Sequence, residues 1–407
     1  MKRMRKESAR RPELPDELWL HIFHKVYKAY AHHRAPLFCL PCVSHQWNQV
    51  FGHYVRKYFE QIKTLYNRIL IRFPETVKLR LDLFEQGTRS HPRDITGSTL
   101  LGLTNLTSLN VNRNITIPDD LTLQLATRLK SLSLRGDTLI TPKALAQMTG
   151  LTKLSLRGMS VSGHALGQLT NLTVLNLSDM AGSVTDNNLR SLTALKSLAV
   201  TRNSWSITGH AFPHLTNMVA LDLQRNDDIT WPLAQLSSLT ALNVSGHCGS
   251  IHDANLCQMT QLKCLWLASN HYVTSKALRN LTQLERLSLY ETRDVDYTVL
   301  TCLTNLKQLS LRRGECKHCG DINLSPLNQL ERLDIDDTHL LIEIFPHDTC
   351  PWRLPALKEL VCSNDEAIKS IPRVTALLES RGVAVCVGTY YHCWKYNADA
   401  WLRGVDL

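Results

Sequence analysis

The chain has 407 residues, of which 43% are hydrophobic and 20% charged, a composition typical of a globular protein and too apolar for a chain that is disordered throughout. Lysine and arginine exceed aspartate and glutamate by 46 − 36 = 10, but +5 of this excess falls within residues 1–12. The rest of the chain carries only about +5, which is too little to indicate a nucleic-acid-binding fold from charge alone.

Residues 1–12, MKRMRKESARRP, form a basic tail. No apolar core follows this tail, so it does not match a secretory signal, and no apolar run in the chain approaches the ~18 residues of a membrane-spanning helix. The twelve cysteines are too scattered for a disulfide framework, and we expect most to be reduced, small apolar core residues. We therefore expect a protein of the cytoplasm or nucleus, with no membrane partner, whose tail is either disordered or a nuclear import signal.

Residues 13–53 have the pattern of a small all-α unit. The opening LPDELWLHIF places acidic residues at the start of an apolar stripe that includes Leu18 and Ile22, as expected at a helix N-terminus. A second apolar segment, LFCLPCVSHQWNQV, contains Ser44, which can cap a further helix that carries Trp47. The spacing therefore predicts helices separated by a polar loop.

Residues 54–75 read as a linker helix, because Val55, Phe59 and Ile62 are spaced to pack on one side and Pro74 ends the pattern. The polar, turn-rich stretch that follows at 87–97 predicts an exposed loop. The linker helix thus separates the first helical unit from the remainder of the chain.

A pattern L-x-x-L-x-L then recurs twelve times at intervals of 21 to 27 residues. Its first positions are Leu106, Leu129, Leu151, Leu172, Leu195, Met218, Leu239, Leu262, Leu284, Leu306, Leu330 and Leu357. Diverged copies are visible before them, around Leu79 and Leu81, and after them, at Val383, Val385 and Val387. So regular a repeat is the sequence signature of a stacked, repetitive fold.

Each copy predicts one short strand and one short outer helix. Leu175 and Leu177 are two residues apart and face the same side of a strand, while Asn176 faces the other side. Thr141 suits a helix N-cap, and Pro142 suits the first helical position. Because one unit cannot bury its own leucines, the units must stack into a continuous core with parallel inner strands.

The repeats resemble the leucine-rich-repeat superfamily, so the expected fold class is α/β: a solenoid over residues 76–388, with residues 389–407 as a C-terminal cap. In that superfamily an asparagine three residues after the second strand leucine hydrogen-bonds backbone groups of neighbouring turns. Asn226 and Asn270 fall at this position, whereas Thr292 replaces it in a later copy.

Residues 13–53 resemble the F-box, whose pairing with leucine-rich repeats defines a known class of proteins. This resemblance implies a non-catalytic substrate receptor of an SCF-type cullin–RING ubiquitin ligase. The segment would dock a Skp-type adaptor, and the solenoid would capture a protein target. The residues that carry the match, and that we expect to contact the adaptor, are Leu14, Pro15, Leu18, Ile22, Phe23, Val43 and Trp47.

A second interpretation is a leucine-rich scaffold whose helical cap does not bind an adaptor. Pro41 interrupts the second helix, and the segment from Tyr27 to Ala35 makes the spacing longer than the F-box pattern. A third interpretation is a nucleic-acid binder that uses exposed arginines and the basic tail. The modest charge outside the tail and the acidic patch from Asp334 to Asp337 argue against it.

The sequence contains none of the motifs that indicate catalysis or a cofactor. We find no G-x-S-x-G, no phosphate-binding glycine loop and no H-E-x-x-H, and we expect no enzyme activity and no cofactor. Cys316 and Cys319 have the C-x-x-C spacing of zinc ligands, but no second pair lies at a suitable distance, so a reduced loop is the favoured interpretation.

The side chains that point away from the core should line the concave inner wall. Arginines recur at the strand ends, and Trp266 and Tyr290 occupy neighbouring strands as two exposed aromatics. These residue types are enriched where proteins bind, although exposed arginines can also serve only solubility. Arginines would suit an acidic or phosphorylated target. The expected target-binding residues are Arg135, Arg157, Arg225, Trp266, Arg286, Tyr290 and Arg312.

Overall fold

The computed structural model describes most of the repeat region and leaves both ends of the chain outside the description. The described residues are 78–82, 104–112, 127–135, 140–158, 161–179, 184–202, 206–230, 232–246, 251–292, 294–312, 322–335, 344, 354–362 and 372–387. The basic tail, the F-box-like segment with all its expected adaptor contacts, the linker helix and the C-terminal cap therefore remain predictions. Cys316 and Cys319 also lie outside the described residues.

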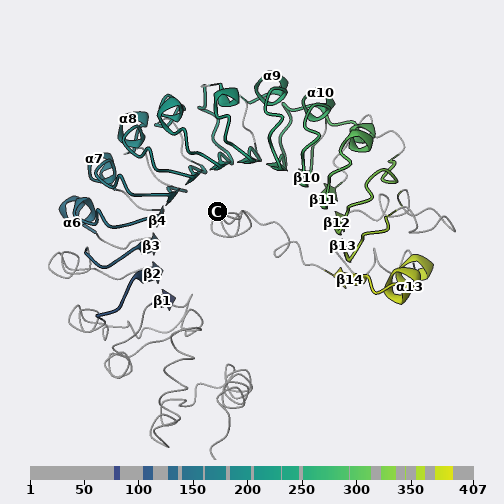
Figure 1. Cartoon of the computed structure of the whole chain (residues 1–407), viewed down its shortest axis with the longest axis horizontal. Coiled ribbons are helices and arrows are strands. Elements are labelled where there is room, and N and C mark those ends of the chain that lie inside the picture. The colour runs from purple at the N-terminus through teal and green to yellow at the C-terminus, as the bar shows by residue number, and fades with distance from the viewer. Residues whose placement is uncertain are drawn as a thin grey trace, which may run out of the picture.

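A single parallel sheet of fourteen described strands lines the inside of an arc (Figure 1). Its strand order follows the sequence order without a crossover. The strands are β1 Lys78–Asp82, β2 Ser108–Asn112, β3 Ser131–Arg135, β4 Lys153–Arg157, β5 Val174–Asn176, β6 Ser197–Ala199, β7 Ala220–Asp222, β8 Ala241–Asn243, β9 Cys264–Trp266, β10 Arg286–Tyr290, β11 Gln308–Arg312, β12 Arg332–Ile335, β13 Glu359–Cys362 and β14 Ala384–Val387. The first and last strands confirm the two diverged copies.

The leucines of successive strands are paired in register, and this alignment builds the core. Leu154 lies opposite Leu175, and Leu175 lies opposite Leu198. All three side chains are buried in one continuous apolar cluster, together with leucines of the outer segments such as Leu145. The predicted stacking of the units, with the sheet as one wall of the core, is confirmed.

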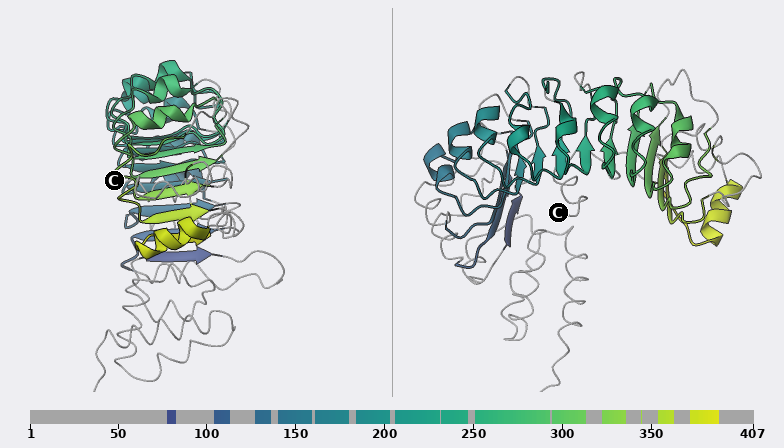
Figure 2. Two further views of the ribbon diagram at one scale, coloured as in Figure 1. Left: turned by 90° about the vertical axis from the view of Figure 1, so that its right-hand side faces the viewer. Right: turned by 45° about the horizontal axis from the view of Figure 1, so that its top comes forward.

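Short helical segments form the outer side of the arc (Figure 2). They are α6 Pro142–Ala146, α7 Gly163–Leu166, α8 Asp186–Leu189, η3 Phe212–His214, η4 Leu233–Gln235, α9 Asp253–Leu256, α10 Ser275–Leu278, η5 Tyr297–Cys302 and α13 Pro372–Ser380. Thr141 caps α6 as predicted, because its side chain accepts a hydrogen bond from the amide of Ala144 at 3.2 Å. Within the described part of the chain, no helix combines the length and apolarity needed to cross a bilayer.

A residue one or three positions after the strand adopts a left-handed backbone in seven of the described repeats. These residues are Gly158, Asp179, Arg202, Arg225, Gly246, Ser269 and Glu291, with φ between 54° and 88°. At Gly246 a side chain is excluded, since an added Cβ would lie 2.6 Å from Cγ of Arg225. The turn therefore repeats the same backbone geometry and presents its side chain at the same edge of the sheet each time.

Asparagines tie neighbouring repeats together inside the turns, as the superfamily pattern implies. The side-chain amide of Asn226 donates to the carbonyl of Val200 at 3.2 Å, and that of Asn270 donates to the carbonyl of Val244 at 2.9 Å. Thr292 instead donates to the carbonyl of Leu289 within its own repeat, at 2.9 Å. The replacement of asparagine by threonine thus removes one tie between repeats.

Candidate functional site

Four arginines and one aspartate lie where strands β3 to β7 end; we call this group the arginine edge. It consists of Arg135, Arg157, Asp179, Arg202 and Arg225. Arg135 and Arg157 are opposite each other in the register of β3 and β4, and the other three hold the left-handed positions after β5, β6 and β7. With parallel strands about 4.8 Å apart, a net charge of +3 spans roughly 20 Å of the inner rim.

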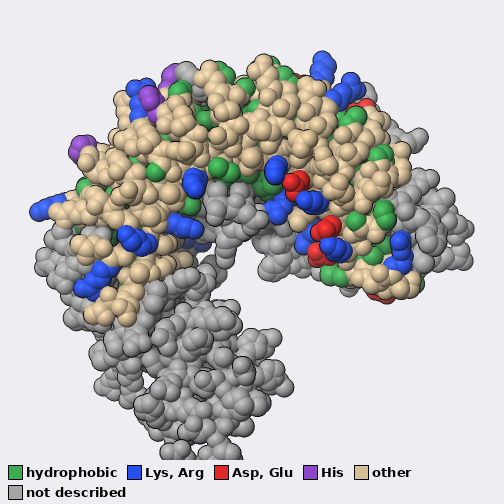
Figure 3. Space-filling model, viewed as in Figure 1, with side chains coloured by type: hydrophobic (Ala, Val, Ile, Leu, Met, Phe, Trp, Pro, Cys, Tyr) green, Lys and Arg blue, Asp and Glu red, His purple; other side chains and the backbone are tan. Residues whose placement is uncertain are grey.

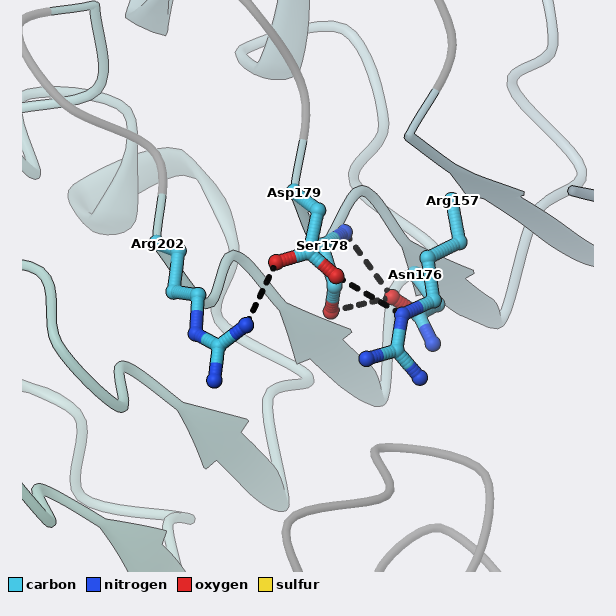
Figure 4. Close-up of polar contacts among 5 residues, drawn as sticks. All are labelled: Arg157, Asn176, Ser178, Asp179 and Arg202. Atoms are coloured by element: carbon cyan, nitrogen blue, oxygen red, sulfur yellow. Dashed lines mark hydrogen bonds and ion pairs between the residues drawn. The ribbon is translucent and has the colours of Figure 1, made fainter. Parts of the chain in front are cut away.

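Asp179 is the centre of this group (Figure 4). Its carboxylate accepts a hydrogen bond from Nε of Arg157 at 2.8 Å and pairs with Nη1 of Arg202 at 3.3 Å. One carboxylate thereby holds two guanidinium groups that come from the repeats on either side of it. A guanidinium carries five N–H donors, so each arginine has further donors for another acidic group.

The buried residues just before Asp179 fix its position. Oδ1 of Asn176 accepts hydrogen bonds from the backbone amide and the hydroxyl of Ser178, at 3.0 and 2.6 Å (Figure 4). The amide of Asp179 in turn donates to the carbonyl of Thr201 at 3.0 Å. The backbone that carries the carboxylate is therefore tied to both its own strand and the next repeat.

The two ion pairs orient the arginines more than they stabilise the fold. The side chains of Arg157 and Asp179 are 21% and 28% exposed, and that of Arg202 is 47% exposed. Pairs this accessible to water contribute ~0–1 kcal/mol each to stability. Their effect is to hold two planar donors at the rim, where an acidic group of a partner can reach them.

The charge at the rim changes along the arc (Figure 3). The left-handed position is occupied by neutral Gly246 and Ser269 in the next two repeats and by Glu291 in the one after. At the other end of the strands, Glu285 pairs with both Lys263 and Lys307, and the hydrogen bond from Lys307 lowers the pKa of Glu285. The positive excess therefore belongs to the β3–β7 portion of the rim.

The structure brings together three of the seven predicted target-binding residues, Arg135, Arg157 and Arg225, on the arginine edge. The other four are Trp266 on β9, Arg286 and Tyr290 on β10, and Arg312 on β11, further along the arc. Arg286 lies opposite Cys264, and Tyr290 lies opposite Arg312. The predicted residues thus divide into an arginine group and an aromatic group.

Trp266 is not the exposed aromatic that the sequence predicts. It is only 9% exposed, and it packs against Ala220, Ala241 and Cys264 in a small apolar cluster of its own. The neighbours on β7 and β8, Ala220 and Ala241, have small side chains, which leaves room for the indole to pack against them. Tyr290 is half-buried on the adjacent strand.

The centre of the inner wall carries a buried carboxyl group that sequence reasoning did not single out. Asp222 on β7 accepts a hydrogen bond from the backbone amide of Gln224 at 3.1 Å, and Asn243 on β8 also bonds its side chain. Burial outweighs both hydrogen bonds and raises the pKa of Asp222 from 3.8 to about 7. The strand pattern predicts only that Asp222 faces the inner wall. It does not predict that the side chain is buried there.

Asp179 was also missed, because its role depends on partners one repeat away on each side. A signal does exist in the sequence: Arg157 and Arg202 lie 22 residues before it and 23 residues after it. Such intervals place residues side by side in a repeat of this period.

The described residues contain no group of three or more histidine, cysteine or acidic side chains that could hold a metal ion. Among the described cysteines the predicted burial is confirmed only for Cys362. Cys257 and Cys264 are half-buried, and Cys302 and Cys386 are exposed. Burial raises the pKa of the Cys362 thiol to about 12. This thiol is therefore neutral and poorly suited to nucleophilic chemistry.

No protein-family model matches the chain, and no curated protein matches it either. Among solved structures, an internalin, InlF of Listeria monocytogenes, is 23% identical, with 80% of this chain and 93% of that chain covered and a TM-score of 0.47. A chain of the Rad7 and Elc1 complex in yeast is 17% identical, covers 86% of this chain and 89% of that chain, and has a TM-score of 0.41. Likenesses this distant say nothing about what this chain binds.

The fold itself is that of a leucine-rich-repeat solenoid. Parallel inner strands, buried leucines in register, short outer helices and asparagine ties between turns all recur along the described repeats. The site that this fold presents is an inner wall with a cationic rim.

Proposed function

We propose that the chain is a non-catalytic substrate receptor of an SCF-type ubiquitin ligase. Residues 13–53, which resemble the F-box, would dock the Skp-type adaptor of the cullin–RING complex. The solenoid would hold a target protein so that its lysines face the ubiquitin-loaded enzyme. The contribution of the chain is then proximity and orientation of two other proteins.

The arginine edge is the observation that supports a protein target of acidic or phosphorylated character. Arg157 and Arg202 are held by one carboxylate, and their remaining donors lie at an accessible rim. Carboxylates and phosphates form paired, charge-assisted hydrogen bonds with such guanidinium groups. An acidic segment that follows the rim from β3 to β7 would contact several arginines in succession.

The ligase connection is tested by co-purification of the full chain with a Skp-type adaptor. We expect wild type to recover the adaptor in a stoichiometric complex and Leu14→Ala/Pro15→Ala to lose it, because these residues open the F-box-like motif. The inner wall of this variant should still bind its target. Failure of wild type to recover the adaptor would leave a leucine-rich scaffold without ligase coupling.

The arginine edge is tested with an array of phosphorylated and acidic peptides and their unmodified counterparts. We expect Arg157→Glu/Arg202→Glu to weaken binding of the acidic peptides at least tenfold, since two attractive charges become repulsive.

The matched control makes the same charge change on the outer face. Arg190 and Arg279 are exposed C-cap residues that directly follow α8 and α10, so Arg190→Glu/Arg279→Glu should leave peptide binding unchanged. If both double variants lost the same affinity for the acidic peptides, the net charge of the protein, and not the arginine edge, would account for the binding. Binding that falls steeply with salt and is stronger for an oligonucleotide than for any peptide would point to the nucleic-acid alternative.

A further inference from the structure

Exposed lysines lie at the amino ends of the strands whose carboxyl ends carry the arginine edge. Lys153 is the first residue of β4, and Lys130 and Lys196 directly precede β3 and β6. All three side chains are exposed, and none has an ion-pair partner among the described residues. Further along the arc, by contrast, the lysines that precede β9 and β11 both pair with Glu285. We call Lys130, Lys153 and Lys196 the lysine edge.

The lysine edge and the arginine edge are two rows of cations with the inner wall between them. On β4, Lys153, Ser155 and Arg157 alternate with two buried leucines, so all three face the wall. Four residues of strand separate the two cations by about 13 Å. Ser155 and Ser133, opposite each other on β4 and β3, are half-buried and form a short polar floor. A partner at this place therefore meets positive charge on two sides.

An α-helix fits these rows better than an extended chain does. With its side chains a helix is about 10–12 Å across, close to the separation of the rows, and it presents side chains on opposite flanks. One flank recurs every turn, about 5.4 Å, whereas one side of an extended chain recurs about every 6.6 Å. Strands are about 4.8 Å apart, so over three intervals the helix is displaced by only about 2 Å and the extended chain by about 5 Å.

We propose that the target segment is an acidic α-helix that lies along the arc between the two edges, with carboxylates on both flanks. This inference rests on the proposed function, because it takes an acidic target at the arginine edge and specifies its form. At about 100° per residue, glutamates at i, i+4 and i+11 share the flank that faces the lysine edge. Glutamates at i+2, i+9 and i+13 share the opposite flank, where they can pair with Arg157, Arg202 and Arg225.

The level of β5 sets the register of such a helix. At its carboxyl end the rim carries Asp179, and Thr173 and Val174 stand at its amino end, so neither edge has a cation there. The two flanks of the helix accordingly have their gap between i+4 and i+9. A helix with this gap places its carboxylates beside cations and keeps them away from the carboxylate of Asp179.

The lysine edge distinguishes this proposal from an acidic chain bound to the arginines alone. The probe is a fluorescent, alanine-based peptide of about 18 residues that carries the six glutamates and spans about 27 Å as a helix. We expect Lys153→Glu/Lys196→Glu in the full chain to weaken its binding at least tenfold. The matched control is Lys143→Glu/Lys276→Glu, at exposed positions of the outer α6 and α10, which should leave binding unchanged. Because all four side chains are exposed, both variants should keep the urea midpoint of wild type.

A second peptide tests the helical form of the partner. It has the same charge, but two central alanines are replaced by proline, which breaks the helix. We expect it to bind wild type at least tenfold more weakly than the helical peptide. Lys153→Glu/Lys196→Glu should weaken its binding no more than twofold, because an extended chain follows one row at a time.

The outcomes separate this proposal from the proposed function. Equal affinity for the two peptides, or unchanged affinity of Lys153→Glu/Lys196→Glu for the helical peptide, would overturn the helix and leave an acidic target at the arginine edge. Failure of every acidic peptide to bind would remove both, whereas adaptor co-purification would still decide the ligase connection. Tighter binding of an oligonucleotide than of the helical peptide would overturn the proposal in favour of nucleic acid.

Discussion

Replacement of Asp222 by asparagine is expected to stabilise the protein at pH 8 by up to about 4 kcal/mol. Burial raises the pKa of this carboxyl from 3.8 to about 7. In the unfolded chain the group ionises near pH 4, so between pH 4 and 7 the folded state binds more protons and stability falls as the pH rises. Each pH unit in that window costs about 1.4 kcal/mol, and above pH 7 the penalty stays constant.

The measurement is urea unfolding of wild type and Asp222→Asn at pH 4, 6 and 8. The stabilisation should be largest at pH 8 and below about 1 kcal/mol at pH 4, where the folded state holds the proton and the unfolded chain is only partly ionised. The side-chain amide of the variant would keep an oxygen that can accept from the backbone amide of Gln224. Asp227→Asn removes a nearby exposed carboxylate and serves as the control for the loss of one negative charge. An equal gain at all three pH values would contradict a titrating Asp222.

Replacement of Asn270 by alanine is expected to destabilise the protein by about 3–5 kcal/mol. The side chain is fully buried, donates to the carbonyl of Val244 at 2.9 Å, and accepts from the amides of Tyr272 and Val273 at 2.9 and 3.1 Å. Alanine leaves these backbone groups without that partner, and each one that water cannot reach costs about 1–3 kcal/mol. The loss should be visible as a lower urea midpoint.

Asn171 provides the matched comparison. Its side-chain amide also ties two repeats, by donating to the carbonyl of Thr149 at 2.8 Å, but it does so at an exposed position. Water can replace this donor, so Asn171→Ala should lower stability by less than about 1 kcal/mol. If both variants lost the same free energy of unfolding, burial of the asparagine would not be what makes these hydrogen bonds between repeats stabilising.

The fold was predictable because its determinants are local and repeated. Leucines two residues apart specify which face of each strand is buried, and Thr141 before Pro142 specifies where α6 begins. Even the weak copies at Leu79 and Val385 form strands, since the neighbouring repeat supplies most of the pairing. Stacking requires only that each unit bury its leucines against the next one.

The inner wall was less predictable because its side chains depend on groups beyond their own repeat. Alternation places Trp266 on the wall but says nothing of the small neighbouring side chains, Ala220 and Ala241, against which it packs. Asp179 acts through arginines on two other repeats. The F-box-like residues, among them Leu14 and Trp47, lie outside the described residues, and their contacts stay predictions.

Strand order that follows sequence order has a consequence for how the chain can vary. Each strand hydrogen-bonds only to the strand before it and the strand after it, so one whole unit can be added or removed without rethreading the others. Such an insertion between β5 and β6 would move Arg202 one step away from Asp179 while leaving the leucine packing of every unit intact. The gain or loss of one repeat can therefore change the distances between the charged side chains of the rim without disturbing the leucine core that stabilises the solenoid.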